Sequence, residues 1–110
     1  MTKIMTSPNS DGSMQEVSPK LAELTYEMLF GDVWERPELS KRDRSLITVA
    51  NLVALYRTDQ LRGHIGRALD NGVTKSEISE IILHTTMYSG WPVGANAARI
   101  AKEVFEERGI

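Results

Sequence analysis

The polar residues best placed for chemistry interrupt an otherwise apolar stretch. Arg44, Thr48 and Asn51 are spaced by four and then three residues, so they share one face of a predicted helix. A buried arginine or asparagine without a partner is strongly destabilising. One interpretation is structural, with Arg44 paired to an acid such as Asp43 or Glu80 and Asn51 satisfied by backbone. In the other, the three residues line a small-molecule pocket, where Arg44 grips a carboxylate through two hydrogen bonds.

The two histidines are candidates for proton transfer. His84 follows Glu80 by one helical turn, so the carboxylate can orient the imidazole and favour its protonated form. His64 lies on another predicted helix. A lone histidine is more often structural than catalytic, so both interpretations stay open for each. The chain has no cysteine, which excludes thiol chemistry, disulfides and thiolate metal sites, and with two histidines we expect no metal site.

Three aromatic residues near predicted helix ends have two interpretations. Tyr88, Trp91 and Trp34 either form the wall of an apolar pocket or belong to the core, which is commoner for such residues. The sequence has no Gly-rich phosphate loop and no G-x-S-x-G nucleophile motif.

The bulk composition restricts partners and location. The net charge is −2 and the cations are spread along the chain, so we expect no binding to nucleic acid or to an anionic membrane. The longest strongly apolar stretch, residues 46–55, is far shorter than the roughly 20 residues that span a bilayer. Residues 1–11 contain no hydrophobic segment typical of a signal peptide. We therefore expect a cytoplasmic protein.

The pattern predicts an all-α domain of about five helices, residues 17–110, after a flexible tail, residues 1–16. A helix over residues 18–30 begins with Pro19 and stops at Gly31, and an ordered loop follows over 31–39. The other helices begin at Ser40, near residue 58, at Thr74 with a capping box, and at Trp91.

The helix that begins at Ser40 is apolar around nearly its whole circumference. In so small a domain a single core rarely covers every side of a helix, so we expect part of it to pack against another subunit. Gly94 and its neighbouring alanines carry little side-chain bulk, which allows another backbone to approach closely there.

Several segments resemble one known family. They are LFGDVWERP (residues 29–37), SKRDRSL (40–46), GH (63–64) followed by ALDNG (68–72), and His84 followed by YSGWP (88–92). These segments are similar to those of the carboxymuconolactone decarboxylase family, and the resemblance covers roughly residues 18–108. The wider superfamily includes alkylhydroperoxidase-D-like thiol peroxidases with a C-x-x-C motif four residues before a histidine. His64 matches that histidine, but Arg57 and Gln60 replace the cysteines and Ser45 replaces a relay glutamate, which excludes peroxidase activity.

The resemblance implies an alkylhydroperoxidase-D-like helical bundle that assembles into a ring, commonly a hexamer or trimer. It also implies cofactor-free decarboxylation of 4-carboxymuconolactone to 3-oxoadipate enol-lactone in protocatechuate catabolism. The enzyme would stabilise the dienolate and protonate carbon.

On this hypothesis the candidate site residues have distinct roles. Arg44 binds the negatively charged carboxylate or enolate of the substrate. His64 is the first candidate for the general acid and His84 the second. The remaining residues bind substrate or enclose the site: Arg36, Thr48, Asn51, Tyr88 and Trp91. Two rival hypotheses stay open, namely an enzyme of the same fold acting on another small lactone or carboxylic acid, and a non-enzymatic helical assembly protein.

Overall fold

The computed structural model describes residues 11–110, in which every regular element is a helix and no strand occurs. The elements in chain order are α1 (Ser13–Val17), α2 (Pro19–Leu24), the π-helix η1 (Thr25–Phe30), the 3₁₀-helix η2 (Val33–Glu35), α3 (Lys41–Ala54), α4 (Thr58–Asp70), α5 (Lys75–Ser89) and α6 (Trp91–Arg108). The predicted all-α class is confirmed.

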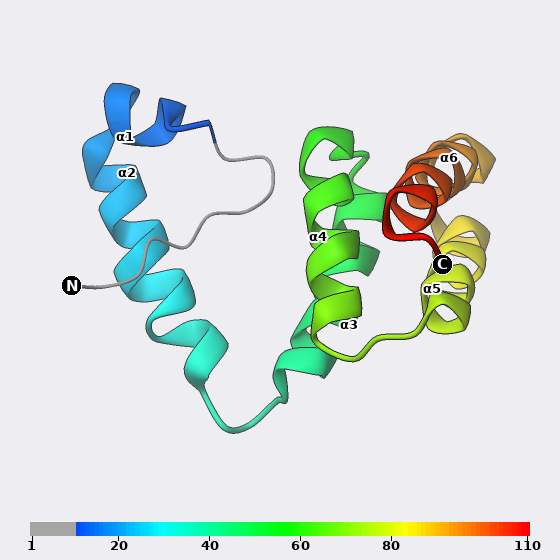
Figure 1. Cartoon of the computed structure of the whole chain (residues 1–110), viewed down its shortest axis with the longest axis horizontal. Coiled ribbons are helices and arrows are strands. Elements are labelled where there is room, and N and C mark those ends of the chain that lie inside the picture. The colour runs from blue at the N-terminus through cyan, green and yellow to red at the C-terminus, as the bar shows by residue number, and fades with distance from the viewer. Residues whose placement is uncertain (1–10) are drawn as a thin grey trace.

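Helices α3 to α6 form a four-helix body around the main core (Figure 1). Helix α3 packs against α4 and α5, and α6 packs against the same two helices. Buried apolar side chains from all four helices, and Val73 from the connection between α4 and α5, meet between them: Val49, Val53, Leu61, Ile65, Ala68, Val73, Ile78, Ala97, Ile100, Ala101 and Val104. The body supplies the rigid surface on which α3 presents its polar face.

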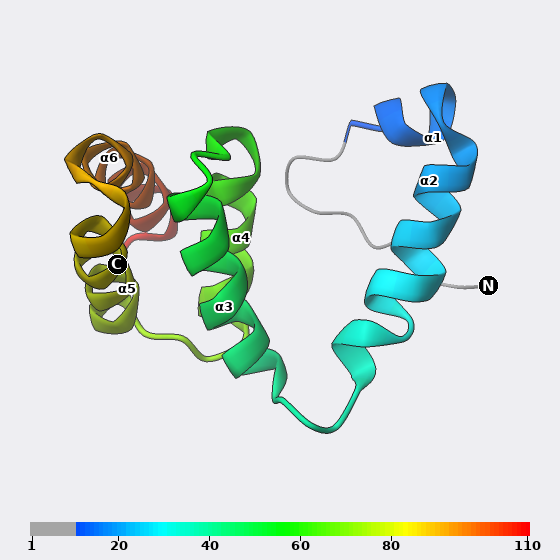
Figure 2. The ribbon, with the colours of Figure 1, turned by 180° about the vertical axis from the view of Figure 1, so that it is seen from behind.

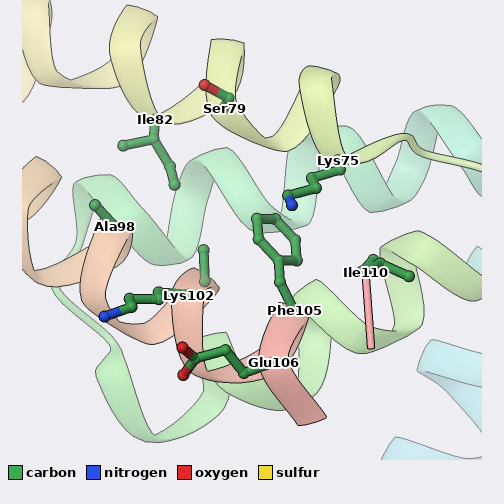
Figure 3. Close-up of a pocket in the computed structure, with 9 residues that line it drawn as sticks. Lys75, Ser79, Ile82, Ala98, Lys102, Phe105, Glu106 and Ile110 are labelled. Atoms are coloured by element: carbon green, nitrogen blue, oxygen red, sulfur yellow. The ribbon is translucent and has the colours of Figure 1, made fainter. Parts of the chain in front are cut away.

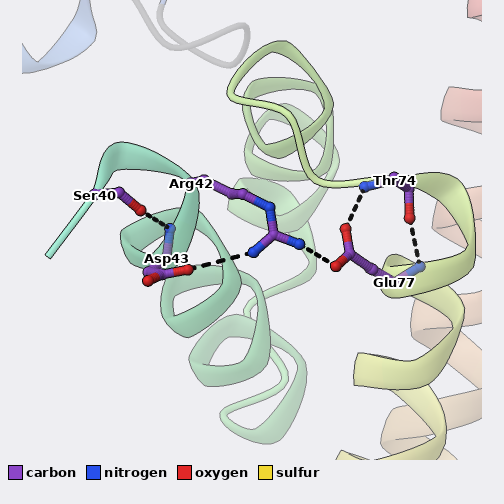
Figure 4. Close-up of polar contacts among 5 residues, drawn as sticks. All are labelled: Ser40, Arg42, Asp43, Thr74 and Glu77. Atoms are coloured by element: carbon purple, nitrogen blue, oxygen red, sulfur yellow. Dashed lines mark hydrogen bonds and ion pairs between the residues drawn. The ribbon is translucent and has the colours of Figure 1, made fainter.

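Local capping signals set the ends of these helices. The Ser40 hydroxyl accepts a hydrogen bond from the Asp43 amide at 3.0 Å, and α3 begins directly after it. Thr74 and Glu77 form the predicted capping box at the start of α5. Arg42 lies between the two helix starts and binds Glu77, and it also contacts Asp43 at 3.3 Å (Figure 4). This polar cluster fixes the first turn of α3 against α5.

Helices α5 and α6 approach each other closely at Gly94. A Cβ atom added there would lie 1.9 Å from Thr86 Oγ1, so only glycine fits the observed spacing. Thr86 is held in place because its hydroxyl donates to the Ile82 carbonyl at 2.7 Å. The small residue at the start of the last helix thus makes room for the side chain of Thr86, whereas the prediction was that another backbone would approach there.

Helices α1 and α2 and the π-helix η1 form an arm that diverges from the four-helix body (Figures 1 and 2). The predicted continuous helix over residues 18–30 begins at Pro19 and changes to π geometry at Thr25. At this change the Thr25 hydroxyl donates to the Leu21 carbonyl at 2.8 Å, which competes with the regular helical ladder. The wide last turn brings Gly31 against the Glu27 carbonyl oxygen, only 2.7 Å from where a Cβ would lie.

The expected flexible tail falls partly outside the described residues. Residues 1–10 are not described, whereas Ser13–Val17 of the same segment forms the short helix α1. The hydroxyl of Thr25 approaches Met14 Sδ at 3.4 Å, which ties α1 to η1 within the arm. The expected loop over residues 31–39 also contains η2, whose Trp34 is buried.

Candidate functional site

A shallow groove lies where the arm, the segment containing η2 and the start of α3 meet. Its volume is about 280 Å³, and most of its lining is apolar. The lining residues are Leu29, Val33, Trp34, Leu39, Arg44, Ile47 and Thr48. Trp34 forms a fixed wall, since it is only 8% exposed and stacks on Phe30 with 6.0 Å between ring centroids. The groove therefore brings two predicted site residues, Arg44 and Thr48, into apolar surroundings.

The guanidinium of Arg44 has unused hydrogen-bonding capacity. Its Nη2 donates to the Arg36 carbonyl oxygen at 3.1 Å, whereas its Nε is buried with no hydrogen-bond partner. Among residues 11–110 no carboxylate forms an ion pair with Arg44, and Asp43 contacts Arg42 instead. Of the two interpretations, the one in which Arg44 pairs with an acid such as Asp43 or Glu80 is therefore wrong. Such a group is suited to bind an anion that enters the groove.

The remaining polar residues of this helix face contribute less. The Thr48 hydroxyl donates to the Arg44 carbonyl at 2.8 Å, so its oxygen can still accept a hydrogen bond from a ligand. Asn51 is exposed and does not line the groove. The Arg36 side chain also lies outside the groove lining and pairs with Glu38 at 3.6 Å. Arg36 acts on the groove through its backbone carbonyl, which positions Arg44.

His64 lies on α4, adjacent to α3, and is partly buried. Burial lowers the pKa of its imidazole below 6.5, and the positive charge of Arg67 lowers it further. Arg67 itself lies over the Phe30 ring at 4.6 Å, and Phe30 stacks on Trp34 of the groove. The imidazole is thus mainly neutral at pH 7. It does not line the groove, although Arg67, whose charge acts on it, packs on the ring that stacks against the groove wall.

Three other predicted site residues, His84, Tyr88 and Trp91, lie away from the groove, near the junction of α5 and α6. His84 and Tyr88 are neighbours with ring centroids 5.1 Å apart, and no ion pair joins His84 to Glu80 in the described part of the chain. Tyr88 is 82% exposed and Trp91 is 68% exposed. None of these three residues lines the groove, so within one chain they do not enclose Arg44.

Sequence reasoning missed the apolar half of the groove. Leu29, Val33, Leu39 and Ile47 line it, yet they come from four separate places in the sequence. The apolar character of each is visible in the sequence, but their meeting depends on the angle between the arm and α3. The buried Ser45, at the position of the relay glutamate in the similar peroxidases, accepts a hydrogen bond from Asn71 Nδ2 at 3.0 Å and is thereby structural.

A second hollow, of about 420 Å³, lies between α5 and α6 (Figure 3). Its lining includes Phe105, with Lys75 Nζ above the ring at 5.2 Å, and Ile82. None of the predicted site residues lines it. Across residues 11–110 no three His, Cys, Asp or Glu side chains gather in a way that could hold a metal ion. Within the same residues, no helix combines the length and apolar character needed to cross a membrane.

By its architecture the described part of the chain is a small all-α domain, with a four-helix body, an arm and a groove that contains Arg44. The sequence model of the carboxymuconolactone decarboxylase family matches residues 19–103, which is most of the chain. The chain belongs to this family.

Curated relatives agree with this assignment. The chain is 48% identical over 81 residues to a 4-carboxymuconolactone decarboxylase of Acinetobacter baylyi, covering 74% of this chain and 60% of that protein. It is 34% identical over 85 residues to a nitrosuccinic acid decarboxylase of Metarhizium robertsii, covering 77% and 59%. It is also 32% identical over 97 residues to an uncharacterised 15.0 kDa protein of Paracoccus denitrificans, covering 86% and 72%. The chain therefore spans about three fifths of the length of the two named decarboxylases.

Proposed function

We propose that this protein decarboxylates 4-carboxymuconolactone to 3-oxoadipate enol-lactone without a cofactor. The observation that carries the proposal is an arginine with a buried, unpartnered Nε in an apolar groove, in a chain 48% identical to a decarboxylase of that name. A decarboxylase needs to bind an acid and to stabilise the electrons that carbon dioxide leaves behind. Arg44 supplies a fixed positive charge for this purpose.

The substrate itself accepts the electron pair. The bond between the ring carbon and its carboxylate breaks, carbon dioxide leaves, and the pair moves through the conjugated ring to the lactone carbonyl oxygen. The product is a dienolate that takes up one proton on carbon. Arg44 stabilises the developing oxyanion, because hydrogen bonds to a charged oxygen in apolar surroundings are stronger than those in water.

The proton donor in this proposal is His64. Its lowered pKa means that only a small fraction of the imidazole is protonated at pH 7, so turnover through this acid increases as the pH falls towards the lowered pKa. His84 is the second candidate. A His64→Gln variant that keeps the wild-type pH profile of kcat would assign the proton to His84 or to water.

Purified protein and 4-carboxymuconolactone test the activity directly. We expect the ultraviolet absorbance of the substrate to fall with release of carbon dioxide, and the Arg44→Met variant to lose this activity. If the wild-type protein gives no turnover and no product is found by mass spectrometry, the assignment to this lactone is wrong.

A second candidate function is decarboxylation of another small acid. The relative from Metarhizium robertsii is named for nitrosuccinic acid, which is not a lactone. Either acid would present a carboxylate to Arg44 beside a group that accepts electrons. Parallel assays with nitrosuccinate and with the lactone separate the two, and a chain that binds neither in thermal-shift measurements favours a non-enzymatic assembly role.

We further propose that the protein works in the cytoplasm as a homo-oligomer, a hexamer or trimer. Support comes from α3, where Ile47 and Leu55 remain 48% and 59% exposed although they are large apolar side chains. Light scattering at micromolar concentration should give a mass well above the 12.3 kDa of one chain. A mass of one chain would contradict the oligomer.

A further inference from the structure

The arm has an apolar face that its own chain does not cover. Leu21, Leu24 and Met28 follow one another at intervals of three and four residues and are each substantially exposed, with Met28 at 54%. Ala22 is the only buried residue in α1, α2 and η1. Helices shorter than about 12–15 residues are marginal in water without tertiary packing. The arm therefore needs a surface on which to pack.

The groove at Arg44 offers an apolar surface that is also uncovered. Val33, Leu39 and Ile47 line it and remain between 38% and 48% exposed. Leu29, near the end of the arm, lines the groove as well, so the exposed face of the arm and the groove form one continuous apolar surface. The rest of the arm of the same chain diverges from the four-helix body (Figures 1 and 2).

The charges of the two surfaces are complementary. The arm carries Glu16, Glu23 and Glu27 against the single cation Lys20. Residues 32–44 around the groove carry four cations and four acids, so the segment has no net charge, but the charged residue that lines the groove is the cation Arg44. The negative arm is therefore attracted to the guanidinium of the groove, whereas two negative arms repel each other.

We propose that the arm of a second copy of this chain packs over the groove, and that each Arg44 site is complete only in this pair. Leu24 and Met28 of one copy then cover Val33 and Ile47 of the other. The catalytic meaning of this contact rests on the function proposed above, whereas the contact itself does not. By excluding water, the second copy strengthens the interaction of Arg44 with a bound anion.

Cross-linking tests the contact without any assay of activity. Because the chain has no cysteine, single introduced thiols react specifically. Met28→Cys protein mixed with Ile47→Cys protein and a short bismaleimide should give a covalent heterodimer on a denaturing gel. Glu23→Cys, on the other side of α2 and paired with Lys20, is the matched control and should give several-fold less.

Three outcomes would overturn the proposal. The first is no excess of heterodimer over the Glu23→Cys control, with Leu24→Cys used if Met28→Cys does not fold. The second is a predominantly intrachain cross-link in the Met28→Cys/Ile47→Cys double variant, because the arm would then cover its own groove. The third is a stronger cross-link from Met28→Cys to Met87→Cys on α5, which would place the arm on another face. If the heterodimer forms but the wild-type protein does not decarboxylate the lactone, only the proposed function is contradicted.

Discussion

Removal of the Arg44 guanidinium should abolish most of the activity with little effect on folding. Arg44→Met keeps the length of an unbranched side chain and removes all five donors. In the folded protein the loss is one hydrogen bond to the Arg36 carbonyl, worth about 1 kcal/mol, and it is offset by removal of the buried, unpartnered Nε. We therefore expect the free energy of unfolding to change by less than about 1 kcal/mol.

The effect on catalysis should be much larger. Two hydrogen bonds from the guanidinium to a charged substrate oxygen contribute about 3 to 5 kcal/mol together. Their loss lowers kcat/KM by roughly two to nearly four orders of magnitude. The separate effects on kcat and KM identify the oxygen that Arg44 binds. A lower kcat at unchanged KM indicates the dienolate, whereas a higher KM at unchanged kcat indicates a carboxylate that is bound equally in the ground state and the transition state.

Steady-state kinetics on 4-carboxymuconolactone, with urea unfolding of the same samples, measure both effects. Arg62→Met is the matched control, since Arg62 lies on α4 and contacts Glu103 and Glu107 outside the groove, and its kcat/KM should stay at the wild-type value. Arg44→Lys keeps the charge but loses the geometry for two hydrogen bonds, so its kcat/KM should lie between those of Arg44→Met and the control variant. If folded Arg44→Met and Arg44→Lys both keep wild-type kcat/KM, Arg44 has no role in the reaction.

Three further predictions concern stability. Gly94→Ala should lower the free energy of unfolding measured in urea by about 1–3 kcal/mol, because the new methyl meets Thr86 Oγ1. In Gly66→Ala the new methyl meets only the end of the Arg108 side chain at 3.0 Å, so the free energy of unfolding should change by less than about 1 kcal/mol. His64 has a lowered pKa in the folded protein, so the unfolded chain binds the extra proton and the free energy of unfolding should fall as the pH drops below 6.5; His64→Gln should reduce this dependence between pH 7.5 and 5. Tyr56 has a φ of 59°, so Tyr56→Gly should raise the thermal midpoint through a gain of roughly 0.5–1 kcal/mol, and Leu55→Gly, at a φ of −83°, should lower it.

Those parts of the fold that depend on local chemistry could be predicted from the sequence. Ser40 and Thr74 mark helix starts because their hydroxyls accept amide hydrogens three residues later. Gly72 marks the end of α4, since its φ of 96° is a conformation that other residues adopt at a cost. Each of these signals needs only a few neighbouring residues, so no tertiary information is required.

The candidate site could be predicted only in part, because its geometry is non-local. The spacing of Arg44 and Thr48 correctly placed both on one helix face, but the acceptor for Arg44 is the Arg36 carbonyl, a backbone atom that carries no sequence signal. The groove also depends on the angle between the arm and α3. Helical periodicity gives the face of each helix but not the angle between two of them.

The division of the groove between two kinds of element bears on how one fold can act on different acids. Arg44 and Thr48 belong to α3, which is fixed by the core and by the Arg42–Glu77 contact, so the guanidinium of Arg44 has a rigid position. Leu29, Val33 and Leu39 belong to the arm and its connection, which pack weakly on the four-helix body. Substitutions there can reshape the apolar wall without moving the arginine. On the function proposed above, the substrate accepts the electrons and the protein mainly supplies a cation held in apolar surroundings, which is compatible with relatives named for a lactone and for nitrosuccinic acid.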